Sequence, residues 1–447
     1  MTSLTFYGGL NEIGGNKILI EQGKTRVFFD FGQSFSLLDE FFVPEAFLSP
    51  RDRFGLRDYF SLGLIPPLKG LYSSGMLEHT NLKYKEPEYD AVFISHPHMD
   101  HFMHLRFLDP KIPIYMGETT ERILRSTQET TKTKVFFEKS KVFNFRTGKK
   151  VKAGEMQVTP IHVDHSVPGA YGFLIDTGEA RIVYSGDLRQ HGKKPEMTRE
   201  FVKKAKELEP DMLIIEGTRV SPRETRKNHT EPDVERKSRN AVKKSKGIVL
   251  GMRYPKDLDR FYTFYSIAKK EGKELVISQK TANLLLHLKD DPIGLPDPIK
   301  DSTIKIFNRE KKVYKKWEKA LQPYSIGTDY IRKSQKRILL ELDSYCMPEL
   351  IDIGPAHGDI IHSMSEPFEE DPVSGLVDRV LRNWAKRFSM NYRQFHASGH
   401  ASKKEIFSMI KEISPKKVVP VHTKHPKLFK KAWEKVVIAR SGKGIET

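Results

Sequence analysis

The residues best suited to carry out chemistry form one short segment, 95–101, which reads Ser-His-Pro-His-Met-Asp-His. This segment follows residues 91–94, an apolar stretch typical of a buried strand. Three imidazoles and a carboxylate on one tight turn are suitable ligands for zinc or a similar divalent cation. The chain has 16 histidines among 447 residues, so this arrangement rarely arises by chance. Segment 95–101 therefore predicts a metal site at the end of a strand.

A single turn cannot complete the coordination of two ions, so other ligands must come from other parts of the chain. Further polar residues lie at or just after apolar stretches, where each predicted strand ends. They are His162, His165, Asp187 and His422. Each alone could have a structural role, but strand ends can meet at one edge of an α/β sheet. We therefore expect several of them to lie beside segment 95–101.

Short apolar stretches predict the strands that must position these residues. In the first half of the chain the predicted strands are 4–7, 17–20, 26–29, 91–95, 112–115, 157–162, 171–176, 181–185 and 212–216. Residues 34–84 contain many aromatic residues and four prolines without a clear period, which predicts an elaborated loop. Its aromatic side chains could serve the core, a dimer contact or a binding platform.

The sequence changes character after residue 218. Residues 221–246 are charged and helix-like, 247–251 read as a buried strand, and the apolar positions of 258–268 fall on one helix face. A strand at 275–278, a helix at 281–288, a strand at 304–307 and a helix at 376–384 continue the alternation before a last strand at 392–395. Alternating strands and helices predict a second α/β domain with a parallel sheet, inserted into the first.

Charge is distributed in blocks. The chain has 76 Lys and Arg against 58 Asp and Glu, a net charge of +18 and a pI near 9.5. Residues 223–273 and 305–337 each carry a net charge of +8, whereas residues 338–395 carry −5. Dispersed charge could serve solubility alone, but blocks of positive charge favour a polyanionic partner such as nucleic acid.

Composition excludes several other classes of protein. One cysteine, Cys346, excludes a disulfide framework and a cysteine-rich zinc ribbon. No apolar run reaches about 18 residues, so we expect no membrane-spanning helix. The first residues lack the basic and apolar regions of a signal peptide, and we expect a cytoplasmic protein.

The order of these motifs resembles a known fold. His96-x-His98-x-Asp100-His101, followed by His165 and Asp187, is similar to the metallo-β-lactamase pattern. The later motifs Glu216-Gly-Thr, Ser398-Gly-His400-Ala and His422 resemble the β-CASP nucleases, specifically the ribonuclease J group and most of all its archaeal members. The resemblance covers essentially the whole chain. It implies an α/β fold, a metallo-β-lactamase αββα sandwich formed by residues 1–217 and 391–447. Residues 218–390 would form the inserted β-CASP domain, which contains a parallel sheet.

The resemblance also implies roles for individual residues. Two Zn²⁺ ions per subunit are expected, with Mn²⁺ or Mg²⁺ as alternatives. One ion would be held by His96, His98 and His165, the other by Asp100, His101 and His422, with Asp187 bridging both. Asp100 would share the catalytic work with three further residues: Asp30, which orients the cluster, the acidic Glu216, and His400, which contacts the scissile phosphate. His400 could act as an acid or stabilise charge.

A phosphate site is expected at residues 396–402. Ser402 and Glu405 form a capping box, so a helix begins there, and helix N-termini attract anions. In the family this stretch receives the 5′ phosphate of RNA, which implies a pocket made by His396, Ser398, Gly399 and His400, with Ser363 and Ser365 as further contributors.

The activity that the resemblance implies is 5′→3′ exonucleolytic hydrolysis of single-stranded, 5′-monophosphorylated RNA, through a water molecule activated by two metal ions. Endonuclease activity could accompany it, and a role in RNA decay or processing and a homodimer are also implied. The alternatives are a DNA nuclease of the same superfamily and a non-catalytic RNA-binding scaffold. A small-molecule metallohydrolase is a further alternative, but it would not need the basic inserted domain.

Overall fold

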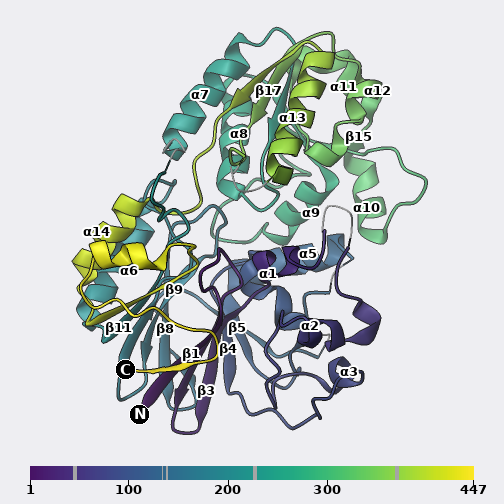
Figure 1. Cartoon of the computed structure of the whole chain (residues 1–447). Helices are drawn as coiled ribbons and strands as arrows, with labels where there is room; N and C mark the ends of the chain where they lie inside the picture. The colour runs from purple at the N-terminus through teal and green to yellow at the C-terminus, as the bar shows by residue number, and fades with distance from the viewer. Residues whose placement is uncertain (44–47, 133, 137–138, 225–228, 368–371) are drawn as a thin grey trace.

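A computed structural model describes residues 1–43, 48–132, 134–136, 139–224, 229–367 and 372–447. Two sheets face each other in the lower half of Figure 1, and a third sheet with its helices lies above them. The two ends of the chain lie close together, because the last strand, β20 (Gly444–Glu446), pairs with the first, β1 (Thr2–Gly8).

The first sheet has the order β20-β1-β2-β3-β4-β5-β6. Its remaining strands are β2 (Lys17–Gln22), β3 (Thr25–Phe31), β4 (Ala91–Ile94), β5 (Ile114–Gly117) and β6 (Val142–Phe145). β1, β2 and β3 are antiparallel, whereas β3 to β6 are parallel to their neighbours. The parallel strands point their carboxyl ends at one edge of the sheet.

The second sheet has the order β19-β11-β10-β9-β8-β7. Its strands are β7 (Val151–Ala153), β8 (Met156–His162), β9 (Tyr171–Asp176), β10 (Arg181–Tyr184), β11 (Met212–Glu216) and β19 (Lys417–Val421). β19 comes from the C-terminal segment and pairs in parallel with β11, which itself pairs in parallel with β10.

Apolar residues between these two sheets form one continuous core. Phe29 and Phe93 of the first sheet contact Phe173 of the second, with ring centroids 5.4 and 5.8 Å apart. Helices α6 (Pro195–Leu208) and α14 (Lys403–Ile413) pack on the outer face of the second sheet. Helix α5 (Glu118–Thr130) and residues of the segment 34–84 cover the first sheet. This arrangement is the predicted αββα sandwich of the metallo-β-lactamase fold.

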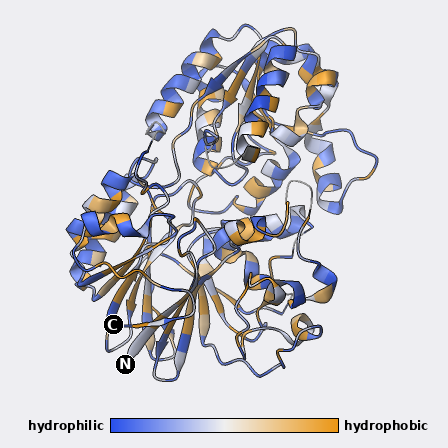
Figure 2. Cartoon of the chain, in the orientation of Figure 1, coloured by the Kyte–Doolittle hydropathy of each residue, from blue (hydrophilic) through white to orange (hydrophobic). Residues whose placement is uncertain are grey.

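The third sheet is parallel throughout, with the order β15-β14-β13-β16-β12-β17-β18. Its strands are β12 (Ile248–Met252), β13 (Glu274–Ser278), β14 (Ile304–Phe307), β15 (Ser325–Ile326), β16 (Ile338–Glu341), β17 (Gly358–His362) and β18 (Met390–Gln394). The larger helices around it are α7 (Glu231–Lys244), α8 (Leu258–Lys270), α9 (Gln279–His287) and α13 (Pro372–Arg387). Apolar residues are buried on both faces of this sheet, and hydrophilic residues colour the outer surfaces of the helices in Figure 2. The predicted α/β insertion with a parallel sheet is confirmed, whereas the exact domain boundaries remain a prediction.

Short helices complete the fold. They are α1 (Phe35–Asp39), α2 (Arg57–Ser61), α3 (Ser74–Leu77), α4 (Met99–Phe102), α10 (Lys316–Leu321), α11 (Thr328–Ser334) and α12 (Glu349–Ile353). The segment 34–84 is therefore more structured than a loop, and its Tyr59, Leu64, Leu71 and Tyr72 are buried in the core. In the predicted helix-like stretch 221–246 the helix begins at Glu231, and residues 225–228 lie outside the described residues. None of the described helices has the length and apolar character needed to cross a membrane.

Candidate metal centre and phosphate site

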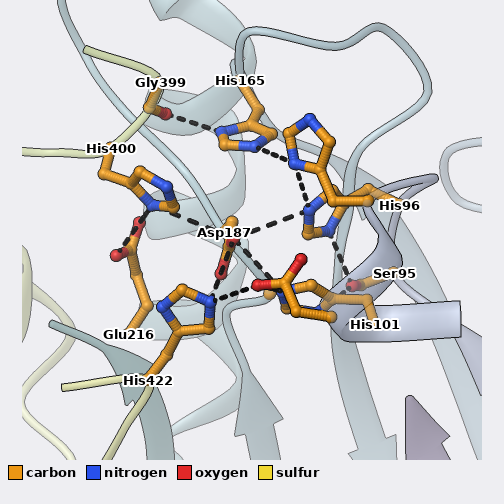
Figure 3. Close-up of polar contacts among 12 residues, drawn as sticks. Ser95, His96, His101, His165, Asp187, Glu216, Gly399, His400 and His422 are labelled. Atoms are coloured by element: carbon orange, nitrogen blue, oxygen red, sulfur yellow. Dashed lines mark hydrogen bonds and ion pairs between the residues drawn. The ribbon is translucent and has the colours of Figure 1, made fainter. Parts of the chain in front are cut away.

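Strand ends bring the predicted ligands together (Figure 3). His96 follows β4 by two residues, and Asp187 follows β10 by three. His422 comes directly after β19, the strand that pairs with β11 next to β10. The parallel register of these strands therefore places side chains from residues 96 to 422 at one edge of the sandwich.

The first group of ligands consists of His96, His98, His165 and Asp187. His98 Nδ1 lies 3.0 Å from His96 Nε2 and 3.1 Å from His165 Nε2. His96 Nε2 lies 3.5 Å from Asp187 Oδ2. Tetrahedral coordination of zinc separates neighbouring nitrogen ligands by about 3.4 Å, so these distances fit one ion.

The second group consists of Asp100, His101, His422 and Asp187. Asp100 Oδ2 lies 3.0 Å from His422 Nε2 and 3.6 Å from His101 Nε2. A side chain at Gly32 would collide with this segment, because a Cβ atom there would lie 1.7 Å from the carbonyl oxygen of Asp100. The backbone therefore approaches the second group as closely as glycine allows.

Asp187 belongs to both groups. Its Oδ2 atom lies 3.2 Å from His101 Nε2, 3.5 Å from His96 Nε2 and 3.6 Å from His422 Nε2. Its Oδ1 atom and the Nε2 atom of His101 are buried and have no hydrogen-bond partner among the residues that the structure describes. Buried polar atoms without partners are costly, and cations held between the two groups would satisfy them. The donor set thus fits two divalent ions.

Burial and charge prepare the first group for coordination. Burial lowers the pKa of His96 and His165 well below the usual range for histidine, and it lowers the pKa of His98 to about 4. All three imidazoles are therefore neutral at pH 7, which is the form that binds metal.

In the second group, nearby carboxylates raise the pKa values of the histidines. Burial lowers the pKa of His422, but the carboxylates of Asp187 and Asp100 outweigh it and raise the pKa to about 9. The same carboxylates and Asp30 raise the pKa of His101 despite its burial. A divalent cation would replace these protons and supply the positive charge in their place.

Asp30 lies outside the two ligand groups and orients one of the ligands, His101. It is the next-to-last residue of β3 and has a left-handed conformation with φ 59°, and its Oδ2 atom lies 2.7 Å from His101 Nδ1. Ser95 donates to the same carboxylate from its backbone N–H, and Tyr184 donates from its hydroxyl, at 2.7 and 2.6 Å. Because Asp30 holds Nδ1 of His101, Nε2 is left to face the metal position.

A second acidic residue, Glu216, orients His400. Glu216 Oε1 lies 3.1 Å from His400 Nδ1, which leaves Nε2 of His400 as the free nitrogen. Thr218 donates its hydroxyl to Glu216 at 2.7 Å and lies 2.8 Å from His422 Nδ1. Thr218 thus turns Nε2 of His422 toward Asp100. The sequence prediction did not assign Thr218 a role, although it is the third residue of the Glu-Gly-Thr motif.

The C-terminal segment also orients a ligand. His165 Nδ1 donates to the carbonyl oxygen of Gly399 at 2.6 Å. A Cβ at residue 399 would lie 2.8 Å from Ser166 Oγ and 3.1 Å from His165 Cε1, so a larger residue there would force these side chains to shift. Gly399 is therefore tied to the metal centre as well as to the predicted phosphate site.

Four of the predicted phosphate-site side chains lie together at the edge of the centre. Ser398 Oγ accepts from the backbone N–H of His400 at 3.1 Å, and Ser365 Oγ lies 3.4 Å from His396 Nε2. Ser363 is different: it is fully buried, and its hydroxyl contacts Arg260 and donates to the carbonyl oxygen of Phe395. The prediction that Ser363 offers a hydroxyl to phosphate is therefore wrong, because the protein already uses that group.

A buried charge network holds the two loops of this site. Glu231 Oε1 accepts from Arg189 at 3.1 Å and from Arg260 at 2.9 Å, and all three side chains are fully buried. Arg189 also donates to the carbonyl oxygen of Ser398 at 3.1 Å, and Arg260 donates to that of Ser363 at 3.0 Å. Burial raises the pKa of Glu231, but Arg260 and Arg189 outweigh it and lower the pKa to about 2. One carboxylate thus links the loops that carry Ser398 and Ser363.

Replacing Glu231 with glutamine is expected to lower the free energy of unfolding by about 3–5 kcal/mol, because two buried guanidinium groups lose the carboxylate that they share, although Arg189 keeps its ion pair with Asp259. Urea denaturation measures this change. The control is Glu235→Gln on the same helix, whose ion pair with Lys270 lies nearer the surface. That change should cost less than about 1 kcal/mol, and equal losses in the two variants would contradict the assigned role of Glu231.

His162 does not join the metal centre. Its ring stacks on Tyr171 at 4.1 Å, and it lines a cavity of about 330 Å³ that also contacts His165. Within the described residues it belongs to neither ligand group, so the interpretation of His162 as a candidate ligand is wrong. A strand-end position alone did not distinguish it from His165.

Family comparisons agree with this architecture. Residues 64–246 match a family described as the beta-lactamase superfamily domain, and residues 387–432 match one described as the Zn-dependent metallo-hydrolase RNA specificity domain. Two parts of the chain therefore resemble a β-lactamase superfamily domain and an RNA specificity domain, and the second match includes the loop at 396–402.

The predicted resemblance to ribonuclease J is confirmed. The chain is 23% identical over 448 residues to ribonuclease J of Pyrococcus abyssi, covering 94% of this chain and 90% of that protein. It is 21% identical over 428 residues to ribonuclease J of Helicobacter pylori, again over 94% of this chain but only 55% of the relative. The chain thus spans about half the length of the Helicobacter protein. A crystal structure of a protein of unknown function from Enterococcus faecalis is also similar, with 26% identity, a TM-score of 0.80 and 99% coverage of both chains.

Proposed function

We propose that this protein is a metal-dependent ribonuclease that hydrolyses single-stranded, 5′-monophosphorylated RNA in the 5′→3′ direction. The observation that carries the proposal is the continuity between two sites. Residues 396–399 would line the phosphate pocket, and the next residue, His400, has its Nδ1 atom 3.8 Å from the Asp187 carboxylate in the candidate metal centre. An RNA end held in the pocket would place its first phosphodiester bond at that centre.

The ligand groups would hold two ions, with zinc the best match to the histidine-rich donors. When bound, these cations supply Lewis-acid chemistry, which activates water and neutralises charge on the phosphate. His400 is held by Glu216 through Nδ1, so its Nε2 faces the substrate side. From there it can donate a proton to the leaving oxygen or a hydrogen bond to a phosphate oxygen.

A pocket at these residues would favour a 5′ monophosphate. Ser365 lies beside His396, and Ser398 and the backbone of Gly399 follow His396 closely in the chain. Buried hydrogen bonds fix the positions of Ser398 and Gly399. A triphosphate is larger and more highly charged, so a fixed pocket would accommodate it poorly.

The direct test compares four substrates with the zinc-loaded protein. They are the same RNA with a 5′ monophosphate, a 5′ triphosphate or a 5′ hydroxyl, and a 5′-monophosphorylated single-stranded DNA. We expect stepwise release of nucleotides from the first RNA and slower release from the others. Faster hydrolysis of the DNA would favour the alternative, a DNA nuclease. Binding of RNA without hydrolysis of any substrate would favour a non-catalytic scaffold.

The basic blocks of the inserted domain would bind the rest of the strand. Two groups of lysines are exposed in this domain. Lys243, Lys244 and Lys246 lie at and after the end of α7, and Lys311, Lys312, Lys315 and Lys316 lie before and at the start of α10. Each phosphate contact adds about −0.7 to the slope of log affinity against log salt for single strands.

Charge reversal in either lysine cluster is expected to flatten that slope, because fewer counterions are released on binding. Fluorescence anisotropy with a labelled single strand at several salt concentrations measures it. Reversal of the exposed Lys149 and Lys150 in the first domain is the control. A slope that neither cluster changes would mean that these lysines only face solvent.

We also propose a homodimer, as the ribonuclease J resemblance implies. Leu376, Val377 and Val380 are exposed on one face of α13 and offer an apolar contact surface in the inserted domain. The mass of the protein in solution, measured by light scattering, tests this proposal.

A further inference from the structure

One loop spans the distance between the phosphate pocket and the metal centre. It joins β12 to α8 and contains Arg253, Tyr254, Pro255 and Lys256. At one end, the hydroxyl of Tyr254 accepts from the backbone N–H of Ser365 at 3.4 Å. Two residues later, Lys256 Nζ donates to the carbonyl oxygen of Pro97 at 2.7 Å. Pro97 separates the ligands His96 and His98, so the loop borders the space that a single nucleotide would occupy.

An ion pair and several hydrogen bonds hold the backbone of this loop in place. Arg253 is buried and forms an ion pair with Glu341 at 2.7 Å. The same guanidinium donates to the carbonyl oxygens of Tyr254 and Pro255 at 3.1 and 2.9 Å. Asp257 closes the loop by accepting from the backbone N–H of Arg260 at the start of α8. The backbone that carries Tyr254 is therefore fixed before any ligand binds.

The ring of Tyr254 nevertheless remains accessible. Its side chain is 40% exposed, and its ring meets that of His396 edge to face, with centroids 6.2 Å apart. Other exposed tyrosines occur in the described part of the chain, but Tyr254 contacts two residues of the phosphate pocket. An exposed aromatic ring on a fixed backbone is a suitable stacking surface for a nucleobase.

We propose that Tyr254 stacks on the base of the first nucleotide of the bound strand. The proposal rests on the proposed function for the position of the 5′ phosphate, and it adds a binding site for the base that follows. Since every base has a π face, such stacking would tolerate any sequence while keeping the first nucleotide in line with the metal centre. Tyr254 is thus a positioning residue that acts on the substrate.

A binding experiment tests the base contact without requiring turnover. Calorimetry of the zinc-loaded protein would compare adenosine 5′-monophosphate with ribose 5-phosphate, which lacks the base. We expect adenosine 5′-monophosphate to bind about tenfold more tightly, in line with the loss on removing one stacking residue. Tyr254→Ala should reduce the ratio of the two affinities to about one, and Tyr254→Phe should preserve the ratio of the wild type.

The matched control is Tyr324→Ala. Tyr324 is 56% exposed and precedes β15, at the opposite edge of the same sheet from β17 and β18. The Tyr324→Ala variant should retain the full difference in affinity between adenosine 5′-monophosphate and ribose 5-phosphate. If Tyr254→Ala also retains it, or if Tyr254→Phe loses it as fully as Tyr254→Ala, the stacking proposal is wrong.

A kinetic experiment separates this proposal from the proposed function. The substrates are 5′-monophosphorylated RNA with a normal or an abasic first nucleotide. Tyr254→Ala should lower kcat/KM about tenfold on the normal RNA and leave it unchanged on the abasic RNA. Equal losses on both would contradict stacking although the ribonuclease activity stands. Absence of hydrolysis by the wild type would refute the proposed function, while the calorimetric difference would still decide the base contact.

Discussion

Asp187→Asn is expected to reduce phosphodiester hydrolysis by at least about a thousandfold while RNA binding stays nearly normal. Asp187 is the one residue shared by both ligand groups, with Oδ2 within 3.6 Å of three imidazole nitrogens, two from the turn after β4 and one from the end of β19. Asparagine keeps the shape but loses the negative charge, so it cannot bridge two cations equally well. RNA affinity should persist because the basic clusters of the inserted domain lie elsewhere.

The measurement combines metal analysis, a single-turnover rate and an RNA-binding curve. Metal content per chain should fall together with the rate. The control is Asp176→Asn, an exposed carboxylate at the end of the neighbouring strand β9, which should leave both unchanged. Normal turnover by metal-depleted Asp187→Asn would rule out a mechanism that depends on two ions.

Ser398→Asp is expected to slow stepwise release from a 5′-monophosphorylated end by about a hundredfold. The side chain of Ser398 is only half-buried, and its oxygen accepts from the backbone N–H of His400. Aspartate can accept the same hydrogen bond, so the loop should keep its conformation. Its negative charge, however, would stand where the terminal phosphate binds, and any internal cleavage should suffer less.

Product lengths over time on RNA labelled at its 3′ end distinguish these outcomes. Ser398→Asn is the matched control, because it has nearly the same size and hydrogen-bonding capacity without the charge. It should lose much less activity than Ser398→Asp. Trimming by Ser398→Asp at the wild-type rate would place the phosphate pocket elsewhere.

The sequence could indicate which residues come together at the candidate metal centre because much of their signal is local. His96 to His101 lie on one turn, and Asp187 and His422 each follow an apolar strand of the second sheet, so packing of the two sheets brings them together. The groups that orient them carry no such signal. Tyr184 is 154 residues from Asp30, and Gly399 is 234 residues from His165, so these hydrogen bonds appear only once the sheets pack.

The buried charges carry no local signal either. Glu231, Arg189 and Arg260 look like ordinary surface charges in a basic stretch, yet tertiary packing buries all three completely. Ser363 was misassigned because nothing local indicates that Arg260 and Phe395 already occupy its hydroxyl. The strand β17 was missed because it begins with Gly-Asp, two residues that are uncommon in strands, although the whole segment is buried.

Because β19 comes late in the sequence, the metal centre is completed late in the synthesis of the protein. The ribosome delivers His96, His98, His165 and Asp187 first, then the whole third sheet, and only afterwards the strand that carries His422. A nascent chain that has reached β18 also lacks the Gly399 carbonyl that orients His165, and it lacks Ser398. Such a chain has the whole first ligand group but lacks the Gly399 carbonyl that orients it. Its second ligand group is incomplete, because His422 is missing. If the protein is a ribonuclease, it thus remains inactive during most of its synthesis, when the messenger RNA that encodes it is closest.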